Sequence, residues 1–516
     1  MLAATCTVMV QAREAKKIVL SPEQQAAVGT VHKAELLPAD KLVYDAEAIS
    51  QAKEGMEKSI ALANADPNRP IYHLMPEAQW MNDPNGAFYA DGWYHVFYQL
   101  NPYRSSWGNI HWGHARSRDN VIWERLPVAN WPSTEKGEDH CYSGSAVKDG
   151  YGNWQLWYPS VSKVREKDKD KGKLDLVFNG QVMIKPMDKD FIKWGKSTDD
   201  PVNKPTLPNN IDGYAWNKYI RDPAFFTASG RTFMVLGSTR GGAPIYEAKN
   251  KELTEWKYRG VMADMAHDCP QMIPFGSKWL YVINRGQYFL GTFDPETAKF
   301  TKENEGILDQ GANYANISFA TDDQGRHIVY AWLVGTKGKG WNNCFPLPRI
   351  LTLGDDGHPI QKPVPALSKL HGNQESVKVS AGANVLKTMG DAVEISAIFR
   401  QADKGKCGLR VRRSGDGARS LAITYENGAL DVFGTKVPIA PEGSDQAISL
   451  QVFLDKAIME VFINGGKKTV LRVMYPPLDD QGIEVFSDGE ATVDVWPMKS
   501  IWADPGVQPA VKSATR

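Results

Sequence analysis

Short apolar runs separated by turn residues dominate the sequence after residue 70. Four clear runs, rich in aromatic and β-branched residues, lie at 154–158, 232–236, 279–283 and 328–332. No long stretch of helical spacing interrupts this pattern. The sequence therefore predicts an all-β fold, and 516 residues are enough for two domains.

Two further features divide the chain into three parts. Residues 45–65 carry apolar side chains at helical spacing, and Pro67 and Pro70 follow them. A cluster of prolines and glycine lies within 361–374, and beyond it strands and turns alternate in a pattern typical of a β-sandwich. We expect a partly helical N-terminal extension at 1–69, a first β domain at 70–362 and a β-sandwich at 375–503.

The stretch from Trp80 to Gly86 places one carboxylate, Asp83, between two asparagines and beside a proline. Proline and glycine favour a tight turn here, and the asparagine amides can bind hydroxyl groups. A carboxylate held between amides and aromatic residues suits sugar chemistry. The alternative is an Asp-Pro turn in which Asp83 bonds only to the local backbone.

Two more acidic turns follow strand-like runs, at Asp222 and at Asp268. Glycoside hydrolysis needs two carboxyl groups in different protonation states on either side of one bond, and acidic turns at strand edges fit this need. Arg221 lies next to Asp222. Because an adjacent cation favours the charged form of a carboxyl group, we expect Asp222 to stay ionised.

The ordered set of motifs resembles glycoside hydrolase family 32, the group of invertases, inulinases and levanases. The matching segments lie at 80–86, 97–102, 112–115, 123–127, 143–147, 221–223, 268–270 and 347–349. The resemblance implies a five-bladed β-propeller at 70–362, followed by the β-sandwich. It also implies a retaining hydrolase that cleaves β-fructofuranosidic bonds in sucrose or fructans.

The resemblance implies a role for each matching residue. Asp83 would be the nucleophile, Asp222 would stabilise the transition state and Asp268 would be the acid/base. The residues expected to hold the sugar are Asn82, Gln99, Trp107, Tyr142, Ser143 and Arg221. For Trp107, the alternative is a tryptophan of the hydrophobic core.

Asp268 departs from the family pattern, which has glutamate at this position. Its side chain is one methylene shorter, and a shift of about 1 Å at a catalytic group can cost on the order of a hundredfold in rate. The backbone could move inward, His267 could share the proton transfer, or the protein could be a poor hydrolase. A weakly active or non-catalytic fructoside-binding protein and a fructosyltransferase therefore stay open as alternatives.

The charge balance and the spacing of the histidines exclude several kinds of partner and site. Lys plus Arg and Asp plus Glu both total 60, so neither nucleic acid nor an anionic membrane is an expected partner. No cofactor is expected, and His111, His114 and His140 lack zinc-finger spacing, so no metal site is expected.

The sandwich offers a surface for pairing, which makes a homodimer one alternative. The apolar stretch Met1 to Ala12 resembles a signal peptide without a basic start, so a secreted or periplasmic location is slightly favoured over a cytoplasmic one.

Overall fold

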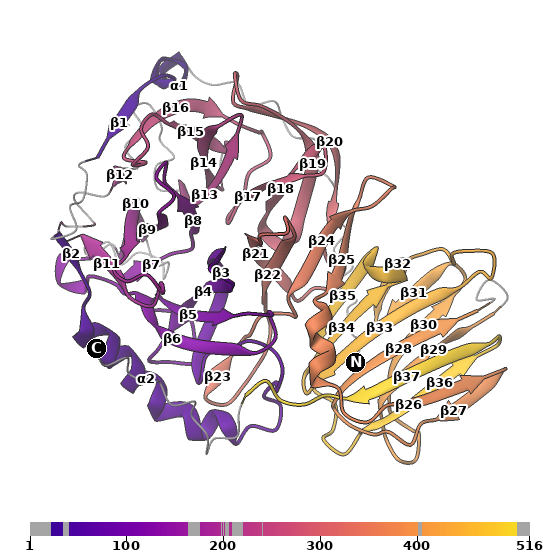
Figure 1. Cartoon of the computed structure of the whole chain (residues 1–516). Coiled ribbons are helices and arrows are strands. Elements are labelled where there is room, and N and C mark those ends of the chain that lie inside the picture. Colours follow the sequence, from indigo (N-terminus) through magenta and orange to yellow (C-terminus); the bar gives the residue numbers. More distant parts are fainter. Residues whose placement is uncertain are drawn as a thin grey trace, which may run out of the picture.

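The computed structural model describes residues 22–34, 41–163, 176–197, 199, 201, 206–208, 220–239, 241–400 and 405–502. The predicted signal segment lies outside these residues. In Figure 1 a ring of sheets lies beside a sandwich of long strands, so the predicted all-β propeller and sandwich are confirmed. None of the helices within the described residues is both long enough and apolar enough to span a membrane.

Within the described residues, five sheets belong to the ring, which Figure 1 shows beside the sandwich. One of these sheets contains β23 (Trp341–Asn342), β3 (Gln79–Ala90), β4 (Trp93–Asn101), β5 (His111–Ser117) and β6 (Trp123–Asn130). The next contains β2 (Leu42–Val43), β11 (Trp194–Ser197), β10 (Leu176–Pro186), β9 (Trp154–Lys163), β7 (His140–Cys141), β8 (Ser145–Lys148) and β12 (Leu207–Pro208).

The other three sheets complete the ring. The first contains β1 (Val31–Lys33), β16 (Glu255–Val261), β15 (Pro244–Ala248), β14 (Arg231–Ser238) and β13 (Ile220–Ala228). The second contains β17 (Gln271–Phe275), β18 (Lys278–Ile283), β19 (Gln287–Asp294) and β20 (Lys299–Ile307). The third contains β21 (Tyr314–Thr321), β22 (His327–Leu333), β24 (Arg349–Leu353) and β25 (Pro359–Pro363). One strand of each sheet lies next to the centre: β3, β8, β13, β17 and β21 contact one another in turn. Side chains from distant parts of the sequence therefore meet at the centre of the ring.

The N-terminal extension is part of the ring. Besides the short α1 (Pro22–Ala27) it forms α2 (Ala46–Asn64), which confirms the predicted helix. Asp45 caps α2, because its carboxylate accepts the backbone N–H of Ala48 at 2.9 Å. Two short strands of the extension, β1 and β2, pair with β16 and β11. The extension thus joins two separate sheets, which its sequence pattern does not predict.

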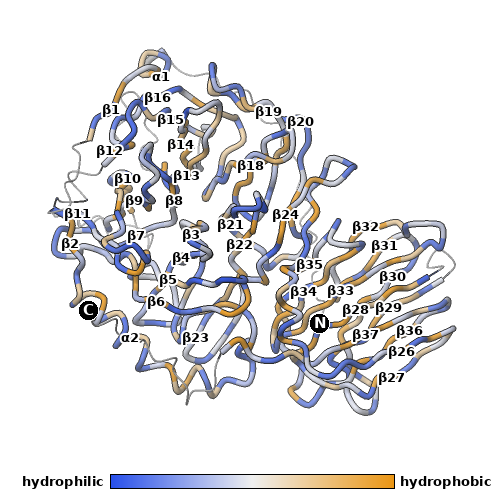
Figure 2. Tube along the Cα trace, viewed as in Figure 1, coloured by the Kyte–Doolittle hydropathy of each residue, from blue (hydrophilic) through white to orange (hydrophobic). Residues whose placement is uncertain are grey.

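The sandwich consists of two six-stranded sheets with an apolar core between them. Its strands appear in Figure 2 with orange hydrophobic segments along their length. One sheet contains β26 (Glu375–Val379), β37 (Ala491–Pro497), β28 (Ala392–Phe399), β33 (Ile448–Asp455), β34 (Ile458–Ile463) and β35 (Lys468–Val473). The other contains β27 (Gly382–Val385), β36 (Gly482–Ser487), β29 (Cys407–Arg413), β30 (Leu421–Glu426), β31 (Ala429–Val432) and β32 (Thr435–Pro438).

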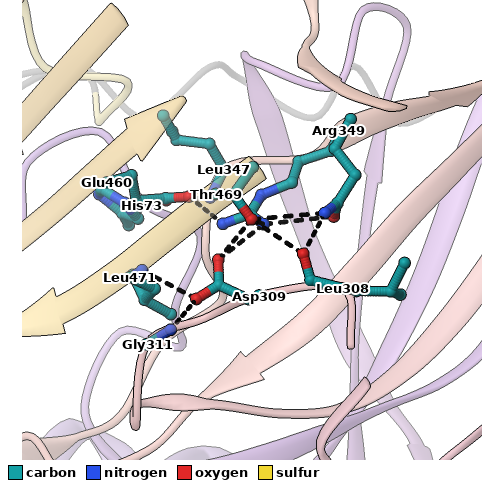
Figure 3. A network of polar contacts seen from close by, with 10 residues as sticks. His73, Leu308, Asp309, Gly311, Leu347, Arg349, Glu460, Thr469 and Leu471 are labelled. Atoms are coloured by element: carbon teal, nitrogen blue, oxygen red, sulfur yellow. Dashed lines mark hydrogen bonds and ion pairs between the residues drawn. The ribbon is translucent and has the colours of Figure 1, made fainter. Parts of the chain in front are cut away.

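A buried network of charges joins the propeller to the sandwich (Figure 3). Arg349 donates to Asp309 at 3.0 Å and to Glu460 of the sandwich at 2.7 Å. On the other side of Glu460, His73 bridges Glu460 at 3.1 Å and Asp455 at 2.7 Å. These two carboxylates raise the pKa of His73 to about 9, against the opposing effect of burial. His73 is therefore an imidazolium at neutral pH, and both of its partners are charged groups of the sandwich.

The raised pKa of His73 makes the stability of the domain interface depend on pH. Because the pKa is higher in the folded state than its ordinary value of 6.5, the stabilisation is complete below 6.5 and is lost as pH rises through about 9. We expect this loss to reach about 3 kcal/mol. Urea unfolding of the wild type and of His73→Gln between about pH 6 and pH 10 should show the loss in the wild type alone. The same pH slope in both proteins would contradict the assignment.

A matched control is available at the rim of the same interface. His371 also pairs with a glutamate, Glu394 at 2.7 Å, but its side chain is 21% exposed. His371→Gln should therefore lower the free energy of unfolding by less than about 1 kcal/mol.

Candidate active site

Irregular pairing at the centre of the propeller positions the polar residues of the site. The register of β3 shifts around Asp83, that of β13 around Asp222 and that of β21 around Asn316. Such bulges turn a side chain away from its regular direction, and they are common next to active sites. Asp222 also has a left-handed backbone, with φ of 56°. The local sequence thus bends three central strands where their polar side chains meet.

Asp83 is held through both of its carboxylate oxygens. The hydroxyl of Ser143 donates to Oδ2 at 2.6 Å, and the amide of Asn316 donates to Oδ1 at 2.9 Å. Gln99 in turn donates to the Ser143 hydroxyl at 2.5 Å. Burial raises the pKa of Asp83 above its usual range, although these hydrogen bonds act in the opposite direction. The carboxylate is therefore fixed in orientation and poorly solvated, and the alternative of an Asp-Pro turn bonded only to local backbone is wrong.

Asp222 lies close to Asp83, and Cys269 connects them. The Cys269 thiol is 3.6 Å from a carboxylate oxygen of each aspartate, and its backbone N–H donates to Asp222 at 3.0 Å. Burial raises the pKa of Asp222 to about 7, and the nearby Asp268 acts in the same direction. The expectation that Arg221 keeps Asp222 ionised is therefore wrong. Arg221, whose Nε lies 3.6 Å away, acts to lower the pKa of Asp222 but does not offset the loss of water.

Asp268 lies just before β17 and forms an ion pair and hydrogen bond with Arg221. Its side chain is 25% exposed, so it is more accessible than the two central aspartates. His267 is close, but its Nδ1 accepts the backbone N–H of Asp268 at 2.8 Å and lies 3.1 Å from the amide nitrogen of Asn284. A ring nitrogen that accepts these hydrogen bonds carries no proton of its own. These contacts occupy Nδ1 of His267 and leave its Nε2 free of them, while Asp268 contacts Arg221 directly.

The remaining predicted sugar-binding residues lie around the carboxylates. Asn82 is buried beside Asp83, and its Oδ1 has no hydrogen-bond partner among the described residues. Trp107 is 40% exposed, so the alternative of a core tryptophan is wrong. Its ring meets the ring of Tyr142 edge-on with centroids 6.3 Å apart. Pairwise contacts and sequence adjacency thus link the nine predicted residues to one another.

Asn316 was missed by sequence reasoning, although it binds the central carboxylate directly. A partial family motif, Asn313 to Ala315, lies immediately before it, and that motif was the only sequence signal. Like that of Asn82, its amide oxygen has no partner in the part of the chain that the structure describes. No group of three or more His, Cys, Asp or Glu within the described ranges is arranged to hold a metal ion. The site therefore contains carboxylates surrounded by unpaired hydrogen-bond acceptors, to which hydroxyl groups of a ligand can donate.

Comparisons with known proteins agree with this geometry. Residues 73–363 match the glycosyl hydrolases family 32 N-terminal domain, and residues 366–501 match the family 32 C-terminal domain. Sucrose-6-phosphate hydrolase of Bacillus subtilis is 26% identical over 88% of this chain and 99% of its own length. Levanase of the same organism is 28% identical over 87% of this chain and 72% of its own length.

Solved structures show the same fold. The GH32 β-fructofuranosidase of Bombyx mori superimposes with a TM-score of 0.74 at 22% identity, over 89% of this chain and all of its own. The exo-inulinase of Aspergillus awamori gives a TM-score of 0.70 at 23% identity, over 85% of this chain and 99% of its own. Since the N-terminal family match alone spans more than half of the 516 residues, the chain belongs to glycoside hydrolase family 32 and is a glycoside hydrolase.

Proposed function

We propose that the protein is a retaining hydrolase of β-fructofuranosidic bonds in sucrose or fructans. The observation that carries this proposal is the fixed carboxylate of Asp83, with both oxygens hydrogen-bonded, next to two further aspartates. The names of the relatives support the substrate class, since they include a levanase and a raffinose invertase. The unpaired amide oxygens of Asn82 and Asn316 suit a ligand that brings hydroxyl donors.

The surroundings of each of the three aspartates determine its role in the reaction. Asp83 attacks the anomeric carbon and forms a fructosyl ester, since its oxygens are already oriented. Asp222, buried and with a pKa of about 7, binds the ring hydroxyls as either donor or acceptor. Asp268 protonates the leaving oxygen and then takes a proton from the incoming water, as expected of the more exposed group. Two displacements give net retention.

The division of the chain and its assembly are part of the same proposal. We place a catalytic five-bladed propeller at 70–362 and the sandwich at 375–503, with 1–69 as an extension. The family matches at 73–363 and 366–501 support this division. A homodimer through the sandwich stays a prediction.

Replacement of Asp83 by asparagine tests the nucleophile. The amide keeps the shape of the side chain but cannot form the ester, so Asp83→Asn should lower kcat by several powers of ten. Asp445→Asn is a matched control, because Asp445 is a half-exposed aspartate of the sandwich. Turnover of sucrose and inulin, with thermal unfolding of each variant, is the measurement. More than about a tenth of normal activity in Asp83→Asn would exclude its role as nucleophile.

Removal of the Asp268 carboxyl group tests the acid/base role. Asp268→Ala should slow sucrose hydrolysis far more than hydrolysis of fructosides with activated aryl leaving groups, which need little protonation. Azide should partly restore the second step, since a small anion attacks the fructosyl ester without a general base. Steady-state kinetics on both substrate types, with and without azide, separate the two steps. Equal kinetics of variant and wild type on all substrates would assign the proton transfer to another group.

Restoration of the family residue tests the effect of the shorter side chain. Asp268 is partly exposed, so Asp268→Glu has room for the extra methylene and should raise kcat by up to about a hundredfold. A fall in kcat would show instead that the local backbone is adapted to aspartate. The comparison is made on sucrose, where protonation of the leaving group matters most.

A further inference from the structure

A second pocket lies between helix α2 of the N-terminal extension and the rim of the β3–β6 sheet. Its cavity volume is about 240 Å³. Its lining includes Glu47, Gln51, Tyr103, His111, Trp131 and Glu135. One wall is therefore built by α2, which lies outside the segments that match the family.

The polar groups of this pocket are mainly hydrogen-bond acceptors. His111 is 5% exposed, and its Nδ1 donates to the carbonyl of Asn109 at 2.6 Å. Its Nε2 has no partner among the described residues and lacks a proton, because burial lowers the pKa of His111 to about 4. Glu47 and Glu135 also line the pocket, and no lysine or arginine of the described chain does. A ligand for this pocket must bring several donors.

A sugar unit meets these requirements better than a metal ion. Its hydroxyl groups supply several donors at once, and Tyr103, which is 39% exposed, provides aromatic surface for the apolar face of a ring. A metal ion would need a group of His, Cys, Asp or Glu around one point, and the described residues contain no such group.

The pairing of strands places this pocket at the same end of the propeller as Asp83. Met81 of β3 pairs with Leu100 of β4, which pairs with His111 of β5. Adjacent strands are about 4.8 Å apart, so the backbone of His111 lies roughly 10 Å from that of Met81, in the same row. Because β3 and β5 both run antiparallel to β4, they begin at the same end of the sheet.

A single loop connects the two sites. The chain between β4 and β5 contributes Tyr103 to the pocket and Trp107 to the rim of the active site. The exposed ring of Trp107 lies with its centroid 5.0 Å from that of His140 and faces Tyr142 edge-on. Tyr142 directly precedes Ser143, the hydroxyl donor to Asp83. Aromatic surface thus extends from the reacting carboxylate toward the pocket.

We propose that this pocket is a distal subsite, which binds a further sugar unit of an oligosaccharide or polysaccharide substrate whose terminal unit is cleaved at Asp83. The inference rests on the proposed function and adds a substrate class to it. The N-terminal extension then gives the enzyme a preference for long fructosides over sucrose, which lacks the further sugar units that the distal subsite binds.

Filling the pocket from α2 tests the proposal. Gln51 is exposed on α2 and lines the pocket, so Gln51→Trp places bulk in it without changing the core. The ratio of kcat/KM for long inulin to kcat/KM for sucrose should fall about fivefold or more, equivalent to about 1 kcal/mol of lost binding. The loss of kcat/KM for inulin should appear as a higher KM with an unchanged kcat, because the reacting groups are unchanged. Lys58→Trp, an exposed position on α2 outside the pocket, should keep the wild-type ratio.

Binding to the Asp83→Asn protein gives a second readout that needs no turnover. Adding Gln51→Trp should raise the Kd of an inulin oligosaccharide about fivefold and leave the Kd of sucrose as it was. An unchanged inulin Kd, or equal losses for inulin and sucrose, would overturn the distal subsite. Binding of sucrose at two independent sites would also overturn it, since the pocket would then hold a separate saccharide. Failure of the wild type to cleave any fructoside would instead overturn the proposed function, whatever the binding result.

Discussion

The arrangement of the propeller depends on one constraint: it must hold several carboxylates close together and away from water. Asp83 and Asp222 are buried, and Asp268 adds a third charge nearby. Loss of hydration and mutual repulsion both oppose this arrangement. The bulges of β3, β13 and β21 offset part of the cost, because they direct an amide and the reacting groups toward the same point. The regular parts of the five sheets hold these irregular segments in place.

The two buried charge networks differ in how well their charges are balanced. At the domain interface, Arg349 and His73 face three carboxylates, those of Asp309, Asp455 and Glu460. In the active site, Arg221 is the cation that contacts the aspartates among the described residues. The interface therefore favours the ionised form of Glu460, since Arg349 and His73 lower its pKa against the effect of burial. The active site has an excess of negative charge, and the pKa of Asp222 rises. Unequal compensation of buried charge thus distinguishes the active-site Asp222 from the Glu460 of the interface.

The sequence was informative where function depends on local motifs and less so where it depends on burial. The strand runs at 154–158 and 279–283 led to the correct fold, and the turn around Asp83 pointed to a carboxylate that the structure holds through both of its oxygens. Asn316 could not be found in the same way, because an isolated asparagine acquires its role only when a bulge directs it. The ionisation of Asp222 was predicted wrongly, since adjacency to Arg221 is visible in a sequence and desolvation is not. Strands β1 and β2 are too short to show a pattern.

The pairing of the N-terminal extension has a consequence for how the protein folds during synthesis. His32 of β1 pairs with Trp256, and Leu42 of β2 pairs with Ser197. At about 5 to 20 residues per second, the ribosome needs roughly 10 to 45 s after making β1 before its partner strand exists. Trp80 of β3 waits still longer for Asn342 of β23, which pairs with it in parallel. Strands β1 and β3 thus wait for partners that are made much later, and the nascent chain carries unpaired strand edges until the ring is nearly complete.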